Sequence, residues 1–172
     1  DQDKLVEFLG KAPFDHTKKL PRPQVGVVTG MAYTQFGGDI LPIEVNHFDG
    51  TGKFIITGQL GDVMKESASI ALDYLKANKE KYGLDDNAFD NQDIHIQVPE
   101  GAIKKDGPSA GVTLTTAIYS AFTNKPVRDD VAMTGEITLR GNVLPIGGLK
   151  EKSISAHRSG IRKIIIPKEN EK

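Results

Sequence analysis

The first half of the chain alternates apolar and polar residues over short runs, which is the pattern of half-buried β-strands. Asp49-Gly50-Thr51-Gly52 separates two of these runs and is typical of a hairpin turn. The stretch 85–93 holds four Asp and no basic residue, so we predict a solvated acidic loop there. The strands predicted in this half are 25–29, 40–45, 53–57 and 94–98.

Other segments repeat their apolar residues at about 3.6 positions, which indicates helices. Residues 64–82 place apolar side chains on one face and charged ones on the other, and Gly83 follows them. Residues 110–122 are small, apolar and rich in Thr, as expected for a largely buried helix. A third helix is predicted from Gly147-Gly148 to Gly160, because glycine commonly follows the end of a helix.

The remaining apolar runs complete the prediction of a mixed α/β (α+β) fold. Strands are predicted at 131–137 and 143–146, joined across Arg140-Gly141-Asn142, and at 163–166. Strands and helices are thus interleaved along the chain. Residues 4–9 resemble the last turns of a helix, and prolines then interrupt the chain up to residue 24. We therefore predict a connector over 1–24 and one folded domain over 25–172.

The composition excludes several classes of protein. The chain has 22 Lys and Arg against 23 Asp and Glu, a net charge of −1, which disfavours a nucleic-acid-binding module. It has no Cys, so a Cys nucleophile, disulfides and thiolate metal sites are excluded. The absence of Cys fits a reducing compartment, and we expect a cytoplasmic protein. No apolar run approaches the ~18 residues of a membrane span. Asp1-Gln2-Asp3-Lys4 includes no initiator Met, so we expect the chain to begin inside a longer protein or after processing.

The segment Asp106-Gly107-Pro108-Ser109-Ala110-Gly111 carries the first candidate chemistry. A serine at the start of a helix lies beside unpaired N–H groups and the positive end of the helix dipole. Such donors can hold the oxyanion of an acyl-transfer reaction. Gly107 and Gly111 permit close backbone approach, and Pro108 suits the first turn of a helix. Ser109 is either a nucleophile or simply a helix cap, and these residues alone favour the cap.

A serine nucleophile needs a base, and none of the four His lies in a local motif that marks it as a catalytic base. A lysine can take this role only if its amine is neutral, which requires burial or a cationic neighbour. Lys152 is the candidate, because it shares a helix face with Leu149, Ser153 and Ala156. The alternative is a lysine at the edge of the core whose amine reaches water, and the spacing alone favours that alternative.

No nucleotide or metal site is predicted from local motifs. Gly58–Ser67 lacks the Gly-Lys-Ser/Thr sequence of a phosphate-binding loop. Gly141–Gly147 does not fit the dinucleotide-binding fingerprint. No cluster of His, Asp and Glu has the spacing of metal ligands. We therefore expect no cofactor and no metal in this domain.

Three segments, Lys105–Val112, Ala132–Arg140 and Val143–Lys152, strongly resemble the proteolytic domain of the Lon proteases. These are ATP-dependent enzymes built with an AAA+ module. The resemblance runs from about Val25 to Pro167. The runs Met-Thr-Gly-Glu-Ile-Thr-Leu-Arg-Gly and Leu-Pro-Ile-Gly-Gly-Leu-Lys-Glu-Lys are highly specific to that family. The resemblance implies the Lon proteolytic-domain fold and a serine endopeptidase.

The resemblance also implies a Ser–Lys dyad and reverses the two interpretations above. Ser109 matches the nucleophile of the family's Asp-Gly-Pro-Ser-Ala-Gly motif, and Lys152 matches the general base. Thr134 matches a threonine that hydrogen-bonds this lysine. Backbone N–H groups around Gly107–Ser109 would hold the oxyanion, in a loop that includes Asp106 and Pro108.

Further positions flank the site only through this resemblance. Glu44 and His95 match polar positions near the active site, although a structural hydrogen-bonding role is equally open for both. Tyr33 stands where members often have Trp, and Gln97 where they often have a second His. Substrate preference is therefore open, whereas the dyad is complete.

The resemblance finally implies a larger machine. Residues 1–24 would be the end and connector of an ATPase module that binds ATP and Mg, and the C-terminus would be truncated. The parent would be a hexameric ring that degrades unfolded, damaged or regulatory proteins, with no membrane or nucleic-acid contact through this domain. A non-proteolytic Lon-like scaffold is the alternative, but such a domain is expected to lack one member of the dyad. We expect weak activity from the isolated domain.

Overall fold

A computed structural model describes residues 23–34, 37–99 and 106–171, and it confirms the mixed α/β class. Its main sheet has six strands in the order β3-β4-β2-β1-β5-β8. The pairs β1–β2 and β2–β4 are antiparallel, whereas β3–β4, β1–β5 and β5–β8 are parallel. The strands are β1 (Val27–Thr34), β2 (Gly37–Asp49), β3 (Phe54–Thr57), β4 (Gln92–Gln97), β5 (Val131–Met133) and β8 (Lys163–Ile165).

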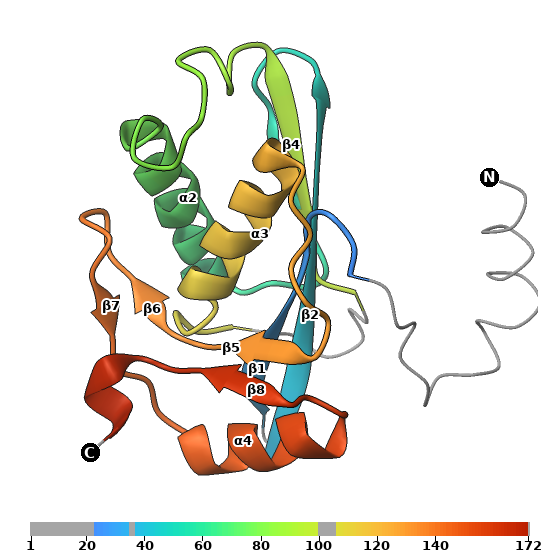
Figure 1. The fold of residues 1–172 in the computed structure, drawn as a ribbon, viewed down its shortest axis with the longest axis vertical. Coiled ribbons are helices and arrows are strands. Elements are labelled where there is room, and N and C mark those ends of the chain that lie inside the picture. The colour runs from blue at the N-terminus through green and yellow to red at the C-terminus, as the bar shows by residue number, and fades with distance from the viewer. Residues whose placement is uncertain (1–22, 35–36, 100–105, 172) are drawn as a thin grey trace, which may run out of the picture.

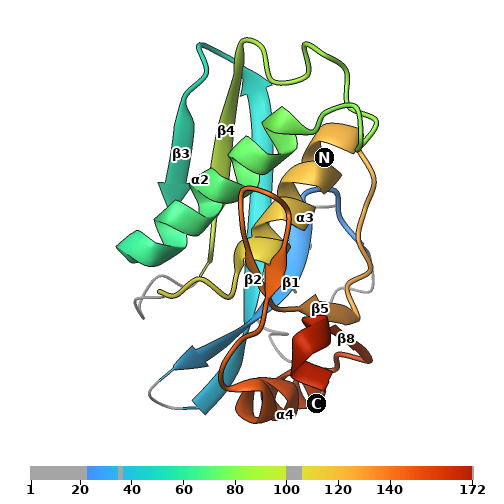
Figure 2. The same cartoon turned by 90° about the vertical axis from the view of Figure 1, so that its left-hand side faces the viewer.

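Three α-helices flank this sheet, and a small hairpin stands beside it (Figure 1). The hairpin pairs β6 with β7. Helix α3 packs on β1 and β2, α2 packs on α3, and α4 packs on the hairpin formed by β1 and β2 (Figure 2). The bounds are α2 (Asp62–Ala77), α3 (Gly111–Thr123), α4 (Leu149–Arg158), β6 (Glu136–Ile137), β7 (Val143–Leu144) and the 3₁₀ helix η3 (Lys168–Glu171).

The sheet has a separate core on each face. Val28 and Ile43 point toward α3 and belong to the larger core, which also includes Leu75 of α2 and Leu114 of α3. The opposite face carries a smaller core beneath α4, formed by Met31, Ala132, Ala156 and Ile161. Each fully buried Leu or Ile contributes roughly 1.5–3 kcal/mol, so both faces are held by the hydrophobic effect. Thus α3 and α4 approach the sheet from opposite sides.

Within the described residues the predicted elements are present; their bounds shift by one or more residues, and three of the changes are substantial. Strands β1 and β2 continue to a long hairpin, because Val27–Thr34 pairs with Gly37–Glu44 without interruption. Helix α2 ends at Ala77 rather than Tyr82, where the Asn78 side chain donates to the Tyr74 carbonyl at 2.8 Å. The strand predicted at 131–137 is broken at Thr134-Gly135, between β5 and β6. The predicted helix at 4–9 lies outside the described residues.

Asp93 corrects the prediction of a solvated acidic loop over 85–93. It lies in β4, is 9% exposed, and its Oδ1 accepts the backbone N–H groups of Thr51, Gly52 and Lys53 at 2.8–2.9 Å. The pKa of the Asp93 carboxyl is lowered, chiefly by the N–H of Lys53. The carboxylate therefore organises the turn between β2 and β3.

Candidate active site

Ser109, Thr134 and Lys152 come from three separate parts of the chain and meet at one place. Ser109 lies two residues before α3, Thr134 directly follows β5, and Lys152 is in the first turn of α4. Lys152 Nζ lies 3.0 Å from Ser109 Oγ and 3.5 Å from Thr134 Oγ1. Helices α3 and α4 lie on opposite faces of the sheet, and residues at the end of β5 contact both the start of α3 and Lys152 of α4.

The main chain of Ser109 is fixed by the segment that follows β5. Its carbonyl accepts the Gly135 N–H at 2.8 Å and the Thr134 hydroxyl at 3.3 Å. The Gly135 carbonyl in turn accepts the Val112 N–H at 3.0 Å. This pair of backbone bonds ties the start of α3 to the end of β5. Gly135 was missed from the sequence, where it lay inside a predicted strand, although an isolated glycine there signals close backbone approach.

Glycine at position 111 is required by space. A Cβ on Gly111 would lie 2.8 Å from both the backbone N and the Cγ2 of Ile137. The predicted close approach of Gly111 is therefore confirmed. The cap interpretation of Ser109 is wrong, because Ala110 occupies the N-cap position of α3 and no side chain caps that helix. The Ser109 hydroxyl is instead directed to Lys152.

The lysine is buried and its surroundings favour the neutral amine. Lys152 is 3% exposed and Thr134 is 1% exposed. Burial lowers the pKa of Lys152, since a charged ammonium is poorly solvated there. Within the part of the chain that the structure describes, the amine has two hydrogen-bond partners, and both are neutral hydroxyl groups. The alternative of a lysine that reaches water at the edge of the core is therefore wrong.

The loop before Ser109 is anchored at its other end by Asp106. Oδ1 of Asp106 accepts the Met64 N–H at 3.0 Å, in the first turn of α2. The N-cap residue of α2 is Gly61, which has no side chain that could cap the helix. Asp106 supplies a carboxylate from elsewhere in the chain instead. Gly107 has φ of +112°, and the Pro108 carbonyl accepts the Gly111 N–H at 3.2 Å.

Glu44 and His95 lie on neighbouring strands, on the sheet face opposite α2 and α3. They line one open hollow of about 250 Å³, and His95 Nε2 lies 2.9 Å from Thr57 Oγ1. Within the described residues, no hydrogen bond joins either side chain to Ser109 or Lys152. Their role beside the dyad stays a prediction. Tyr33 pairs with Gly38 through the backbone, and its side chain lies outside the described part.

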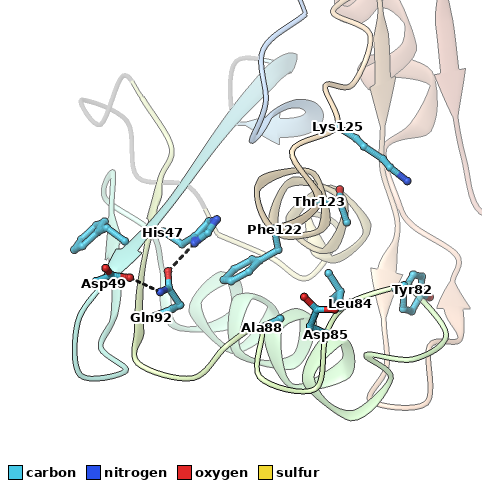
Figure 3. Close-up of a pocket in the computed structure, with 12 residues that line it drawn as sticks. His47, Asp49, Tyr82, Leu84, Asp85, Ala88, Gln92, Phe122, Thr123 and Lys125 are labelled. Carbon is cyan, nitrogen blue, oxygen red and sulfur yellow. Dashed lines mark hydrogen bonds between the residues drawn. The ribbon is translucent and has the colours of Figure 1, made fainter.

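A larger hollow, of about 790 Å³, opens at the far end of α3 (Figure 3). There His47 stacks on Phe122 with ring centroids 4.0 Å apart, and its Nδ1 lies 2.8 Å from Gln92 Oε1. Gln92 in turn donates to Asp49. The hollow is lined by Phe122 and Thr123 at the C-terminal end of α3, whereas Ser109 precedes its N-terminal end, and the 13-residue helix is about 20 Å long. The hollow is therefore not part of the site at the dyad.

Within 23–34, 37–99 and 106–171, no three His, Asp or Glu side chains come together as a set that could hold a metal ion. None of the helices in these same ranges is long and apolar enough to cross a membrane.

The fold and the site define the class of this chain as a serine-type peptidase domain. Along its whole length, residues 1–172, the chain matches the family described as the Lon protease (S16) C-terminal proteolytic domain. It therefore belongs to the Lon protease family and has the proteolytic domain of that family. The resemblance drawn from Lys105–Val112, Ala132–Arg140 and Val143–Lys152 is confirmed.

Named relatives agree with this membership. The chain is 66% identical over 168 residues to the Lon protease of Mycoplasma mycoides subsp. mycoides, with 98% of the chain and 21% of the relative covered. It is 56% identical over 172 residues to the Lon protease of Chloroflexus aggregans, covering 100% and 21%. It is 56% identical over 168 residues to Lon protease 1 of Bacillus subtilis, covering 98% and 22%. The chain spans about a fifth of the length of these relatives. The non-proteolytic scaffold is not favoured.

Proposed function

We propose that this domain hydrolyses peptide bonds with Ser109 as the nucleophile and Lys152 as the general base. The observation that most supports this is the 3.0 Å separation of Lys152 Nζ and Ser109 Oγ, with the lysine 3% exposed. That distance is within the reach required for proton transfer. Burial supplies the second requirement, because it lowers the pKa of the amine.

Acylation begins when the neutral amine of Lys152 removes the hydroxyl proton of Ser109. The Ser109 Oγ attacks the carbonyl carbon of the substrate, and the carbonyl oxygen becomes an oxyanion. The ammonium of Lys152 then gives its proton to the leaving amine nitrogen as the C–N bond breaks. The product at this stage is an ester between Ser109 and the acyl part of the substrate, with a neutral Lys152.

Deacylation repeats these proton transfers with water. Lys152 removes a proton from the water that attacks the ester carbon, and then returns that proton to Ser109 Oγ as the ester bond breaks. Thr134 Oγ1 orients the amine throughout, which is the role of the third group in serine hydrolases. Backbone N–H groups around Gly107–Ser109 hold the oxyanion, and each such donor contributes roughly 10²–10³ in rate.

The domain works within a larger ATP-dependent protease. Its relatives, which are named Lon proteases, are about five times longer than the chain, which leaves room for an ATPase module that binds ATP and Mg. We place this domain in a cytoplasmic, hexameric ring that degrades unfolded, damaged or regulatory polypeptides. Confinement of cleavage inside such a ring explains how a serine peptidase avoids folded proteins.

Three variants test the dyad in the full-length protein. Ser109→Ala is expected to abolish cleavage of an unstructured polypeptide, because it removes the nucleophile. Lys152→Ala is expected to do the same. Lys152→Arg is not expected to restore cleavage, because a guanidinium stays protonated. The release of labelled peptides measures turnover, and circular dichroism confirms that each variant is folded. Cleavage retained by a folded Ser109→Ala variant would contradict the proposal.

A further inference from the structure

Helix α4 rests against the β1–β2 hairpin at a glycine. Gly38 lies near the start of β2, and a Cβ built on it would lie 2.2 Å from the carbonyl oxygen of Glu151. The same Cβ would lie 2.5 Å from the Glu151 carbonyl carbon and 2.8 Å from the backbone N of Lys152. Real Cβ atoms do not approach so closely, so any side chain at position 38 would force the hairpin and α4 apart.

The atoms that Gly38 faces are those of the helix backbone, which cannot rotate away as a flexible side chain could. Gly38 has no left-handed backbone angle, so its glycine is explained by space rather than by conformation. One turn further along α4, Ala156 is fully buried against Met31 and Ala132. Helix α4 therefore lies close to the sheet at two points where the residues are small.

Lys152 lies at the first of these points, and its side chain must span the distance from α4 to Ser109. The side chain is anchored on the α4 backbone, whereas Ser109 is anchored on β5 through Gly135. A displacement of α4 away from the sheet therefore lengthens the Nζ–Oγ distance. It also admits water to an amine whose neutral form depends on burial.

We propose that Gly38 is a positioning residue for the dyad: its missing side chain lets α4 lie close enough for Lys152 to reach Ser109 and stay buried. This inference rests on the proposed function of the dyad and adds a residue that touches neither reacting group. A misplacement of ~1 Å in an active site can cost about 10²-fold in rate.

The lowered pKa of Lys152 is caused by burial and not by charged groups around it. On α4 and the β1–β2 hairpin, the charged residues beside Gly38 and Lys152 in the chain are Asp39, Lys150 and Glu151, and all three are exposed. The other titratable residues of α4, His157 and Arg158, are exposed as well. Burial is the cause that lowers the pKa of Lys152. The pH dependence of Ser109 acylation therefore reports how closely α4 packs on the sheet and how fully Lys152 is buried.

The test compares Gly38→Ala with Gly147→Ala in the full-length protein. Gly147 precedes α4, has no left-handed backbone angle, and a Cβ there meets nothing within 4 Å. The rate of Ser109 acylation by a serine-directed covalent inhibitor is measured against pH. For Gly38→Ala we expect a rate at pH 8 that is lower by about 10²-fold. We also expect an apparent pKa shifted upward, toward the ~10.4 of ordinary lysine. Gly147→Ala is expected to match the wild type in both.

The pH profile separates positioning from a loss of stability, because partial unfolding lowers the rate without moving the apparent pKa. A folded Gly38→Ala protein with the wild-type rate and profile overturns the inference. Should Gly38→Ala not fold, Ala156→Val is decisive. It pushes α4 outward from its second contact and must show the same upward shift, and an unmoved profile overturns the inference. Failure of the wild type to acylate at Ser109 would instead overturn the proposed function.

Discussion

Two neighbours of a lysine decide whether it can act as a base: water, which favours the ammonium, and other charges, which can favour either form. Lys152 is 3% exposed, and within the described residues its amine has two hydrogen-bond partners, both neutral hydroxyls. The burial that lets Lys152 act as a base in the proposed mechanism also costs the fold free energy, because the unfolded chain solvates the ammonium freely. Activity and stability therefore oppose each other at this single position.

This opposition predicts that Lys152→Met stabilises the chain while it abolishes hydrolysis. The folded pKa of Lys152 lies below its ordinary value of 10.5, so below that pH the unfolded state binds more protons than the folded state. The cost to stability thus grows as the pH falls below the unfolded pKa, and it vanishes as the pH rises above it. We expect a higher melting temperature for Lys152→Met at pH 7, with a gain that shrinks toward pH 10.5. A lower melting temperature at pH 7 would contradict this reasoning.

Residue chemistry could be predicted only in part from the sequence. The helix face shared by Lys152 and Ala156 was predicted, and both are buried. Spacing alone favoured a solvent-exposed amine for Lys152 and a cap for Ser109, because local pattern contains no information on what packs against a face. Only the specific motifs around these residues, taken together as a family resemblance, indicated the dyad. Gly38 and Gly135 contact distant segments. An isolated glycine inside a predicted strand signals close backbone approach at Gly135, but it does not tell which segment approaches.

At the scale of elements, the site depends on how strand ends and helix starts are joined. Strand β5 stops at Met133, and the next two residues bind the start of α3 through Ser109 and Val112. The sequence predicted one strand across this point, since its apolar residues run on to Ile137. The break arises at Gly135, whose backbone N–H bonds to the Ser109 carbonyl, whereas the Thr134 N–H still bonds to Ile165 of β8. A tertiary contact thus overrides local β propensity.

The turn between β2 and β3 has a comparable tertiary anchor in Asp93, which leads to a second stability prediction. Asp93→Ala is expected to lower the melting temperature of this chain at pH 7, because three backbone N–H groups lose their acceptor. The pKa of Asp93 lies below its ordinary 3.8, so its contribution is present above that pH and is lost as the pH falls through the folded pKa. The difference between wild type and variant should shrink in acid.

Asp90→Ala is the matched control, because Asp90 belongs to the same acidic segment and is exposed. It is expected to leave the melting temperature within experimental error of the wild type. Equal losses for Asp90→Ala and Asp93→Ala would show that the charge of the segment, rather than the turn, carries the effect.

On the scale of the whole molecule, α3 and α4 lie on opposite faces of the sheet and approach each other at one end of β5. The far end of α3 takes no part in the proposed active site. The class of fold and the order of elements were predictable, because periodicity and turn residues are local. The packing of helices on both faces of the sheet was not predictable, because it depends on the side of the sheet on which each helix lies. The chain covers about a fifth of its relatives' length, so its surroundings in a complete protease belong to the proposal.

The proposed ring predicts that activity depends on assembly. We expect this chain alone to cleave a small unstructured peptide slowly at low protein concentration, and more slowly per subunit than the full-length protease. The specific rate should rise with protein concentration as subunits associate, which sedimentation can follow in parallel. A specific rate that equals that of the full-length protease at low concentration would contradict a requirement for ring neighbours.

The central claim is that Ser109 is activated by a neutral Lys152, and its most direct measurement is the pH dependence of covalent modification at Ser109. A serine-directed inhibitor is added to the full-length wild type and to Lys152→Ala, and mass spectrometry of peptides locates and times the adduct. The account predicts one adduct, on Ser109. Its rate should rise with pH around an apparent pKa below the 10.5 of ordinary lysine and be nearly absent in Lys152→Ala. An adduct on another residue, or an equal rate in a folded Lys152→Ala protein, would contradict it.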